Sequence, residues 1–199
     1  MVFKPSELAP GSAWALGDIL HRAGTPAGVF NMVFGPGAQV GNAMVEDPRV
    51  HGLTFTGSVA TGTRIAEGSL QTNRRLQMEM GGKNPLVVLD DADLDQAVAC
   101  AVDSAFFQSG QRCTASSRLI VTEEIYSRFV EGVVDALRSL RVGHALDPES
   151  QIGPVASAEA LERLLGEISR ARAEGATLRI GGDHLSRSTP IRKLSLIHI

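Results

Sequence analysis

The sequence predicts an α/β protein with a mostly parallel β-sheet. Short apolar segments typical of strands alternate with longer segments whose apolar residues recur every three or four positions, the spacing of one helical face. No Asn-Gly pair joins consecutive strands, so tight antiparallel hairpins are not expected. With 199 residues, the chain is long enough for one well-developed core or for parts of two domains.

The first 90 residues are expected to alternate between strands and helices. The clearest helix covers residues 12–23 and is stopped by Gly24 and Pro26. Its apolar residues have the spacing of a buried stripe, formed by Ala13, Leu16, Ile19, Leu20 and Ala23. Two further helices are expected, a short one near residues 40–44 and one capped by Ser58. The strands are expected at residues 2–5, 29–34, 50–56, 76–80 and 86–89.

The second half continues the alternation. Asp90, Asp91 and Asp93 precede a helix that runs to about Phe107, because acidic residues cap helix N termini and complement the helix dipole. A strand at residues 118–121 precedes a helix at 126–140, whose apolar face comprises Phe129, Val130, Val133, Val134 and Leu137. The last expected elements are a strand at residues 178–180 and, before it, an amphipathic helix at 158–173 with Leu161, Leu164, Leu165 and Ile168 facing inward. Residues 185–199 do not continue this pattern, and we assign them no structure and no role.

The composition excludes several classes of function. The longest apolar runs are far too short to cross a bilayer, and residues 1–5 contain no apolar core of a signal peptide. A net charge of −3 provides no basic surface for nucleic acid or anionic lipid. Cys100 and Cys113 are too far apart for a CxxC pair and do not match a zinc site, so free thiols in the cytoplasm are expected. The histidines are scattered without metal-ligand spacing, and no metal is expected.

Cys113 is the candidate nucleophile. It lies in a polar, glycine-containing segment beside Arg112, which is typical of a loop, and Gly110 allows the backbone to approach a substrate closely. A thiolate attacks a carbonyl carbon and a thiol does not, so a catalytic cysteine needs an electropositive, partly open site. A buried, inert cysteine is an equally good interpretation from composition alone. Cys100, on a helix rich in Ala and Val, is expected to serve packing.

Glu79 is the candidate general base. If Leu76, Met78 and Met80 face one side of a strand, Glu79 points to the other side. Gly81 and Gly82 end that strand, and the carboxyl ends of parallel strands are where α/β proteins bind ligands. Partial burial there would favour general-base chemistry. Taken alone, a surface glutamate on an edge strand is the better interpretation.

Three segments are candidates for binding a nucleotide. The sequence GPGAQVG at residues 35–41 follows a strand and opens a helix, but its spacing is one residue longer than the dinucleotide-binding fingerprint. Gly57 permits a close turn, and Ser58 offers a hydroxyl and a helix N terminus to a phosphate, although an ordinary N-cap explains Ser58 equally well. Lys4, Ser6 and Glu7 follow the first strand, where a solvated loop is the default interpretation.

Taken together, these segments resemble the aldehyde dehydrogenase family, which uses NAD or NADP. The motifs FTGS (residues 55–58), EMGGKNP (79–85) and GQRC (110–113) occur in the family's order and spacing, and KPSE (4–7) and AGTPAGVFN (23–31) resemble the segment that precedes them. The resemblance covers residues 2–183. It implies a partial Rossmann-like parallel sheet over residues 1–80, followed by the first part of an α/β catalytic domain over 81–184, with the tail 185–199 unrelated to the family.

The resemblance also implies a role for each site residue. Cys113 corresponds to the nucleophile that forms a thiohemiacetal and then a thioester, and Glu79 to the base that activates the cysteine or the deacylating water. Lys4 and Glu7, with Ser6 between them, match contacts to the adenine ribose, and Ser58 matches a pyrophosphate contact. The glycines that match turns or backbone beside the cofactor are Gly37, Gly57 and Gly81.

The sequence around Cys113 most resembles the 2,5-dioxovalerate (α-ketoglutarate semialdehyde) dehydrogenases. A small-molecule aldehyde as substrate and a homo-oligomeric parent protein are therefore expected. The family's oxyanion-binding asparagine and its nicotinamide-ribose glutamate do not occur here, so we expect an internal fragment that is weakly active or inactive alone. Two alternatives stay open: a coenzyme A-acylating dehydrogenase, which would not need Glu79, and a non-catalytic nucleotide-binding or redox-sensing protein with an oxidisable Cys113.

Overall fold

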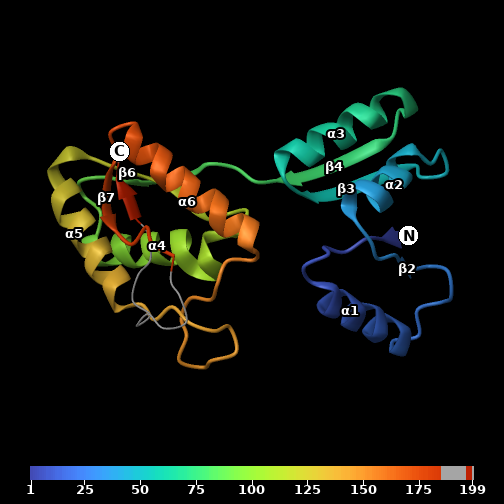
Figure 1. The fold of residues 1–199 in the computed structure, drawn as a ribbon, viewed down its shortest axis with the longest axis horizontal. Helices are drawn as coiled ribbons and strands as arrows, with labels where there is room; N and C mark the ends of the chain where they lie inside the picture. Colours follow the sequence, from blue (N-terminus) through green and yellow to red (C-terminus); the bar gives the residue numbers. More distant parts are fainter. Residues whose placement is uncertain (185–195, 199) are drawn as a thin grey trace. The chain divides into compact units, whose positions relative to one another are not determined.

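Three parallel strand pairs and the helices between them make up most of the computed structural model, which describes residues 1–184 and 196–198 (Figure 1). This architecture confirms the predicted α/β class with a mostly parallel arrangement of strands. The chain divides into two compact units, Met1–Gly81 and the residues from Gly82 onward. None of the described helices has the length and apolar character that crossing a membrane requires.

The first unit contains two parallel strand pairs. In the first pair, Val2 lies opposite Asn31 and Phe3 opposite Met32; in the second, the register runs from Gly52 opposite Arg75 to Gly57 opposite Met80. The elements of the unit are β1 (Val2–Phe3), α1 (Pro10–Arg22), β2 (Asn31–Met32), the π-helical turn η1 (Gly37–Gly41), α2 (Asn42–Glu46), β3 (Gly52–Gly57), α3 (Val59–Ser69), the 3-10 turn η2 (Leu70–Thr72) and β4 (Arg75–Met80).

Helix α3 covers one face of the β3–β4 pair (Figure 1). Ser58 caps this helix as predicted, since its hydroxyl accepts the backbone N–H of Thr61 at 3.2 Å. A Cβ atom at Gly62 would lie 2.4 Å from the sulfur of Met80, so the Met80 side chain packs directly on the backbone of α3 at this glycine. Side chains alternate along a strand, so Met80 faces α3 and Glu79 points to the opposite face.

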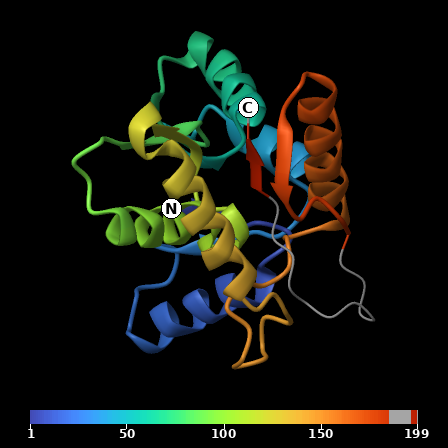
Figure 2. The same cartoon turned by 90° about the vertical axis from the view of Figure 1, so that its left-hand side faces the viewer.

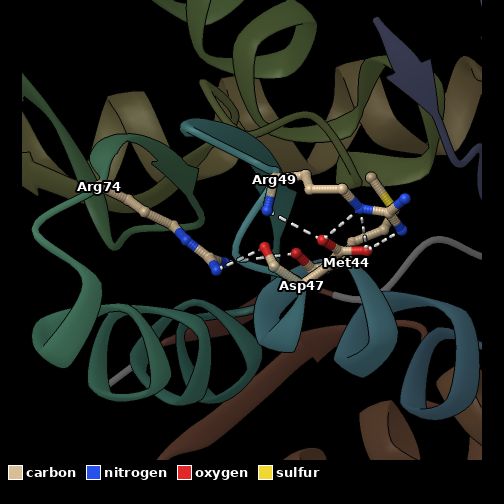
Figure 3. A network of polar contacts seen from close by, with 4 residues as sticks. All are labelled: Met44, Asp47, Arg49 and Arg74. Atoms are coloured by element: carbon tan, nitrogen blue, oxygen red, sulfur yellow. Dashed lines mark hydrogen bonds and ion pairs between the residues drawn. The ribbon is translucent and has the colours of Figure 1, made fainter.

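Arg74, just before β4, binds the end of α2 (Figure 3). Its guanidinium donates to the carbonyl oxygen of Asp47 at 2.6 Å, to that of Met44 at 3.4 Å and also to that of Val45. The final carbonyls of a helix have no partner within the helix, so Arg74 satisfies them and ties α2 to β4. The Asp47 carboxylate pairs instead with exposed Arg49, whose side-chain hydrogen bonds hold the pKa of Asp47 well below its usual range.

The second unit carries the better-developed core. Its elements are β5 (Asn84–Val88), α4 (Leu94–Phe106), the 3-10 turn η3 (Phe107–Gly110), β6 (Ser116–Val121), α5 (Glu123–Ser139), α6 (Ala158–Ala173), β7 (Thr177–Ile180) and β8 (Leu196–His198). Strands β5 and β6 are parallel, and α4 and α5 pack against each other (Figure 2). The buried core residues are Val88, Ala101, Ile125, Phe129, Val133 and Leu137.

The predicted apolar face of α5 is confirmed, because Phe129, Val133, Val134 and Leu137 are buried, although the helix begins at Glu123 and not at Tyr126. Asp93 caps α4 by accepting the N–H of Gln96 at 3.0 Å, and α6 has the predicted bounds. The predicted stripe on α1 is wrong for Leu16 and Ile19, which are 42% and 54% exposed, and in α6 Leu164 is exposed as well. The periodicity shows which residues share a face, but burial also requires a second element packed on that face, and the described residues provide none for these side chains.

Two further expectations are corrected. Cys100 is exposed, because the buried side of α4 is the one that carries Ala101, so Cys100 does not serve packing. The tail, to which we assigned no structure, contains β8, which pairs antiparallel with β7 through Leu178 opposite Ile197. Residues 185–195 and 199 lie outside the described part of the chain.

Replacement of Arg74 by alanine is expected to destabilise the chain. The change removes charged hydrogen bonds to three carbonyl groups, and such bonds contribute roughly 1.5–3 kcal/mol each to stability. Arg49→Ala is the matched control, because it removes an exposed arginine from the same network and should have a smaller effect. Urea unfolding of both variants measures the difference; equal losses of stability would contradict the assigned role of Arg74.

Candidate active site

Cys113 lies on an exposed turn between η3 and β6. The backbone N–H of Ala115 donates to the carbonyl of Arg112 at 3.1 Å, which closes a four-residue turn with Cys113 at its second position. Within the described residues Cys113 is exposed, and the buried position that was the alternative interpretation is not found. The thiol is therefore accessible to a small molecule, as nucleophilic chemistry requires.

The backbone before Cys113 is strained. Gln108, Ser109 and Gly110 have φ angles of 52°, 60° and 67°, in the left-handed region that side chains other than glycine rarely adopt. At Gly110 a side chain is excluded altogether, because its Cβ would lie 2.7 Å from the carbonyl oxygen of Ala105. Such strain costs on the order of 1–3 kcal/mol per residue and persists only where surrounding contacts enforce it.

Contacts with residues 153–156 enforce this conformation. The hydroxyl of Ser109 donates to the carbonyl of Gly153 at 2.7 Å, and the side-chain oxygen of Gln111 accepts the N–H of Ala156 at 3.0 Å. Both bonds join residues more than 40 positions apart, so they fix the turn to a separate part of the unit. Ser109 and Gln111 could not be identified from the sequence, since their partners are backbone groups that have no sequence pattern.

Arg112, the residue before Cys113, is engaged by the segment that precedes the turn. Its guanidinium carbon lies 5.0 Å from the centre of the Phe107 ring. The same group donates to the carbonyl of Asp103 at 3.2 Å and lies 3.9 Å from its carboxylate. Arg112 therefore stabilises the turn against the end of α4, through cation–π and polar contacts.

Asn84, the first residue of β5, binds the cysteine turn from the other side. Its side-chain amide donates to the carbonyl of Cys113 at 2.7 Å and to that of Ala115 at 3.2 Å. In the sequence, Asn84 is recognisable only as part of the EMGGKNP motif. The parallel register of β5 and β6 brings it here, because Asn84 lies opposite Ser116, which follows the turn directly.

Glu79 lies near the carboxyl end of β4, in the first unit, and its side chain is exposed. The expected partial burial is therefore not found. Thr56 lies opposite Glu79 in the register, so both point to the face away from α3. Cys113 belongs to the second unit, and the convergence of its thiol with the Glu79 carboxylate stays a prediction.

Gly57, Ser58 and Gly81 lie together at the carboxyl ends of β3 and β4. A Cβ at Gly57 would lie 2.6 Å from the ring of Phe55, whereas a Cβ at Gly81 would have no neighbouring atom within 4 Å. The first turn of α3 carries no acidic side chain. Backbone N–H groups at a helix N terminus attract anions, so this edge fits a phosphate-containing ligand.

Lys4, Glu7 and Gly37 form a second cluster, at the carboxyl ends of β1 and β2. A carboxylate oxygen of Glu7 accepts the N–H of Gly37 at 2.5 Å and lies 4.0 Å from the Lys4 ammonium. Lys4 also donates to the carbonyl of Pro5 at 2.7 Å. Ser6 is engaged locally, since its hydroxyl accepts the N–H of Leu8 at 3.2 Å. Ser6 and Glu7 are exposed, so the segment is a solvated loop, as in the default interpretation, but it carries these defined contacts.

Comparison with known proteins gives a consistent result. The model of the aldehyde dehydrogenase family matches residues 1–192, which includes the first part of the predicted tail. Betaine aldehyde dehydrogenase of Cereibacter sphaeroides is 45% identical over 183 residues, which are 92% of this chain and 38% of that protein. The chain thus spans 38% of the length of this curated relative.

Solved structures extend the similarity to the fold. An NADP-dependent enzyme of E. coli gives a TM-score of 0.94 at 38% identity, over 99% of this chain and 41% of that one. Betaine aldehyde dehydrogenase of Staphylococcus aureus, solved with NAD+, gives 0.93 at 32% identity, over 98% and 40% of the two chains. With a family model that matches nearly every residue and relatives at this level of identity, the chain belongs to the aldehyde dehydrogenase family.

Proposed function

We propose that this chain carries the nucleophile, the general base and part of the dinucleotide site of an enzyme that oxidises an aldehyde to a carboxylic acid with NAD or NADP. The observation that supports this most strongly is the exposed Cys113 on a strained turn. Contacts with α4, with the start of β5 and with residues 153–156 hold this turn. An inert surface cysteine would not need a backbone conformation that costs stability.

In the proposed reaction, the Cys113 thiolate attacks the aldehyde carbon and forms a thiohemiacetal. Among the described residues, the N–H of Cys113 donates no hydrogen bond, so it is available to the developing oxyanion. When bound, the nicotinamide dinucleotide supplies the hydride acceptor. The resulting thioester is released by water that Glu79 deprotonates, and this step leaves a free carboxylic acid and the thiol.

The residues of the first unit would hold the dinucleotide. Gly57, Ser58 and Gly81 would lie against its phosphates and nicotinamide end, at the open edge of β3 and β4. Lys4 and Glu7 would contact the adenine ribose, with Ser6 in the connecting loop. Only one oxygen of the Glu7 carboxylate is engaged by described residues, so the other could accept ribose hydroxyl groups.

The substrate is proposed more narrowly as an aldehyde that carries a carboxylate, such as 2,5-dioxopentanoate. The motif around Cys113 supports this, whereas the name of the relatives favours betaine aldehyde, a cation. The two candidates have opposite charges, so kcat/KM measured with each distinguishes them directly. The cytoplasmic location and the homo-oligomeric parent stay predictions. Of the tail that was expected to be unrelated to the family, only residues 193–199 lie outside the family match.

Activity is best tested in a chimera, because the chain spans 38% of its relative and is expected to turn over aldehyde weakly or not at all alone. Residues 1–183 would replace the matching segment of the Cereibacter sphaeroides relative. We expect NADH formation by the chimera, a loss of at least about 10⁴-fold in Cys113→Ser, and a loss of roughly 10²–10⁴-fold in Glu79→Gln.

The products of the same assay decide between the alternatives. Free carboxylic acid from the unsubstituted chimera supports the hydrolytic reaction, and acyl-coenzyme A formed on addition of coenzyme A would indicate the acylating type instead. Undiminished turnover in both variants would exclude the assigned roles and leave a nucleotide-binding or redox-sensing function. Cys100→Ser is the control, because this second exposed thiol should be dispensable.

Glu7 is expected to select NAD over NADP. Its carboxylate would lie beside the adenine ribose and would repel a 2′-phosphate, while Lys4 compensates only partly. In the chimera, Glu7→Gln should therefore raise the ratio of kcat/KM for NADP to that for NAD by about tenfold, which corresponds to about 1.4 kcal/mol. The converse change, Lys4→Gln, removes the positive charge that attracts a 2′-phosphate and should therefore lower this ratio. If neither variant changes the ratio, the adenine ribose does not bind at this cluster.

A further inference from the structure

The side chain of Asn84 makes an unusual pair of contacts. Its amide nitrogen donates to two carbonyl oxygens of the cysteine turn, those of Cys113 and Ala115. One of these oxygens belongs to the proposed nucleophile itself. The β-bulge at the start of the β5–β6 pairing, where the register shifts between Asn84 and Pro85, allows one side chain to span both groups.

Each Cys113 peptide plane is then fixed by a different hydrogen bond. The carbonyl of Arg112 lies in the same rigid peptide plane as the N–H of Cys113, and it accepts the N–H of Ala115. The carbonyl of Cys113 lies in the next plane, and Asn84 holds it. With both planes fixed, the direction of the Cys113 N–H is set relative to the Cα–Cβ bond that carries the thiol.

We propose that Asn84 is a positioning residue, which aligns the N–H of Cys113 with its thiolate so that the N–H binds the oxygen of a carbonyl under attack. This inference rests on the proposed function. It assigns no chemistry to Asn84 itself, because the Asn84 amide contacts the backbone carbonyl of Cys113 and not the reacting thiol or N–H. A shift of about 1 Å at a reacting group can cost roughly 10²-fold in rate, so the two hydrogen bonds have a large effect on catalysis.

Two reactions of the same thiolate test this alignment. With p-nitrophenyl acetate, the sulfur adds to the ester carbonyl and an oxyanion forms. When this oxyanion collapses, the bond to p-nitrophenolate breaks and a thioester remains on Cys113. With iodoacetamide, the sulfur displaces iodide and no oxyanion forms. Both rates are proportional to the fraction of Cys113 that is thiolate, so this fraction cancels in their ratio. The ratio therefore reports oxyanion stabilisation even in a variant that changes the ionisation of Cys113.

The experiment uses the 199-residue chain in a Cys100→Ser background, in which Cys113 is the one remaining cysteine. Asn84→Ala removes both hydrogen bonds, and Asn84→Asp keeps the shape but loses the donor. We expect the acylation-to-alkylation ratio to fall about tenfold or more in both variants, while alkylation alone changes by less than about threefold. Asn42→Asp, an exposed asparagine of the first unit, controls for added charge, and circular dichroism confirms folding of each variant.

A second chain with Cys113→Ser presents only Cys100, a helix thiol that is exposed and has no such turn around it. If the ratio for Cys113 exceeds that for Cys100 but is unchanged in both Asn84 variants, the inference is wrong and the proposed function stands. If the ratio for Cys113 does not exceed that for Cys100, the N–H of Cys113 binds no oxyanion in this chain and the inference fails, while the chimera assay decides the proposed function.

Discussion

The left-handed backbone at Gln108, Ser109 and Gly110 is the constraint on which the cysteine site depends. Three successive residues in this region reverse the chain between α4 and β6 within a few positions, and a Cβ at Gly110 would collide with the end of α4. The conformation is unfavourable by itself, so it needs external support. Ser109 and Gln111 obtain that support from residues 153–156, and this explains why a distant loop is part of the site.

The parallel pairing of strands has a similar organising effect in the first unit. Since the carboxyl ends of parallel strands meet at one edge, residues that follow β3 and β4 are brought together although more than 20 positions separate them in the chain. The same rule brings Glu7 to Gly37 beyond β1 and β2. The fold thus produces two clusters of polar and glycine residues without any fingerprint motif in the sequence.

Local rules predicted the elements well, because caps and periodicity act within a few residues. Ser58 and Asp93 begin helices by hydrogen bonds to N–H groups three positions ahead, which a sequence shows directly. Burial depends on partners elsewhere in the chain, and there the prediction failed: Leu16 and Cys100 are exposed although their surroundings are apolar. Asn84 was missed for a related reason, since a side chain that binds backbone carbonyls needs no particular residue as its partner.

Arg112 shows that the position of a charged residue in the sequence does not determine which groups its side chain contacts. Its charge adjoins Cys113 in the chain, yet the guanidinium stacks on Phe107 and binds Asp103, with the result that it supports the turn. In the proposed reaction, negative charge develops on a carbonyl oxygen at Cys113, and hydrogen-bond donors of fixed direction stabilise such charge without reorganisation. The backbone N–H of Cys113 is such a donor, and its direction is set by the turn. The conformation of the turn is therefore the feature on which the proposed oxyanion stabilisation depends.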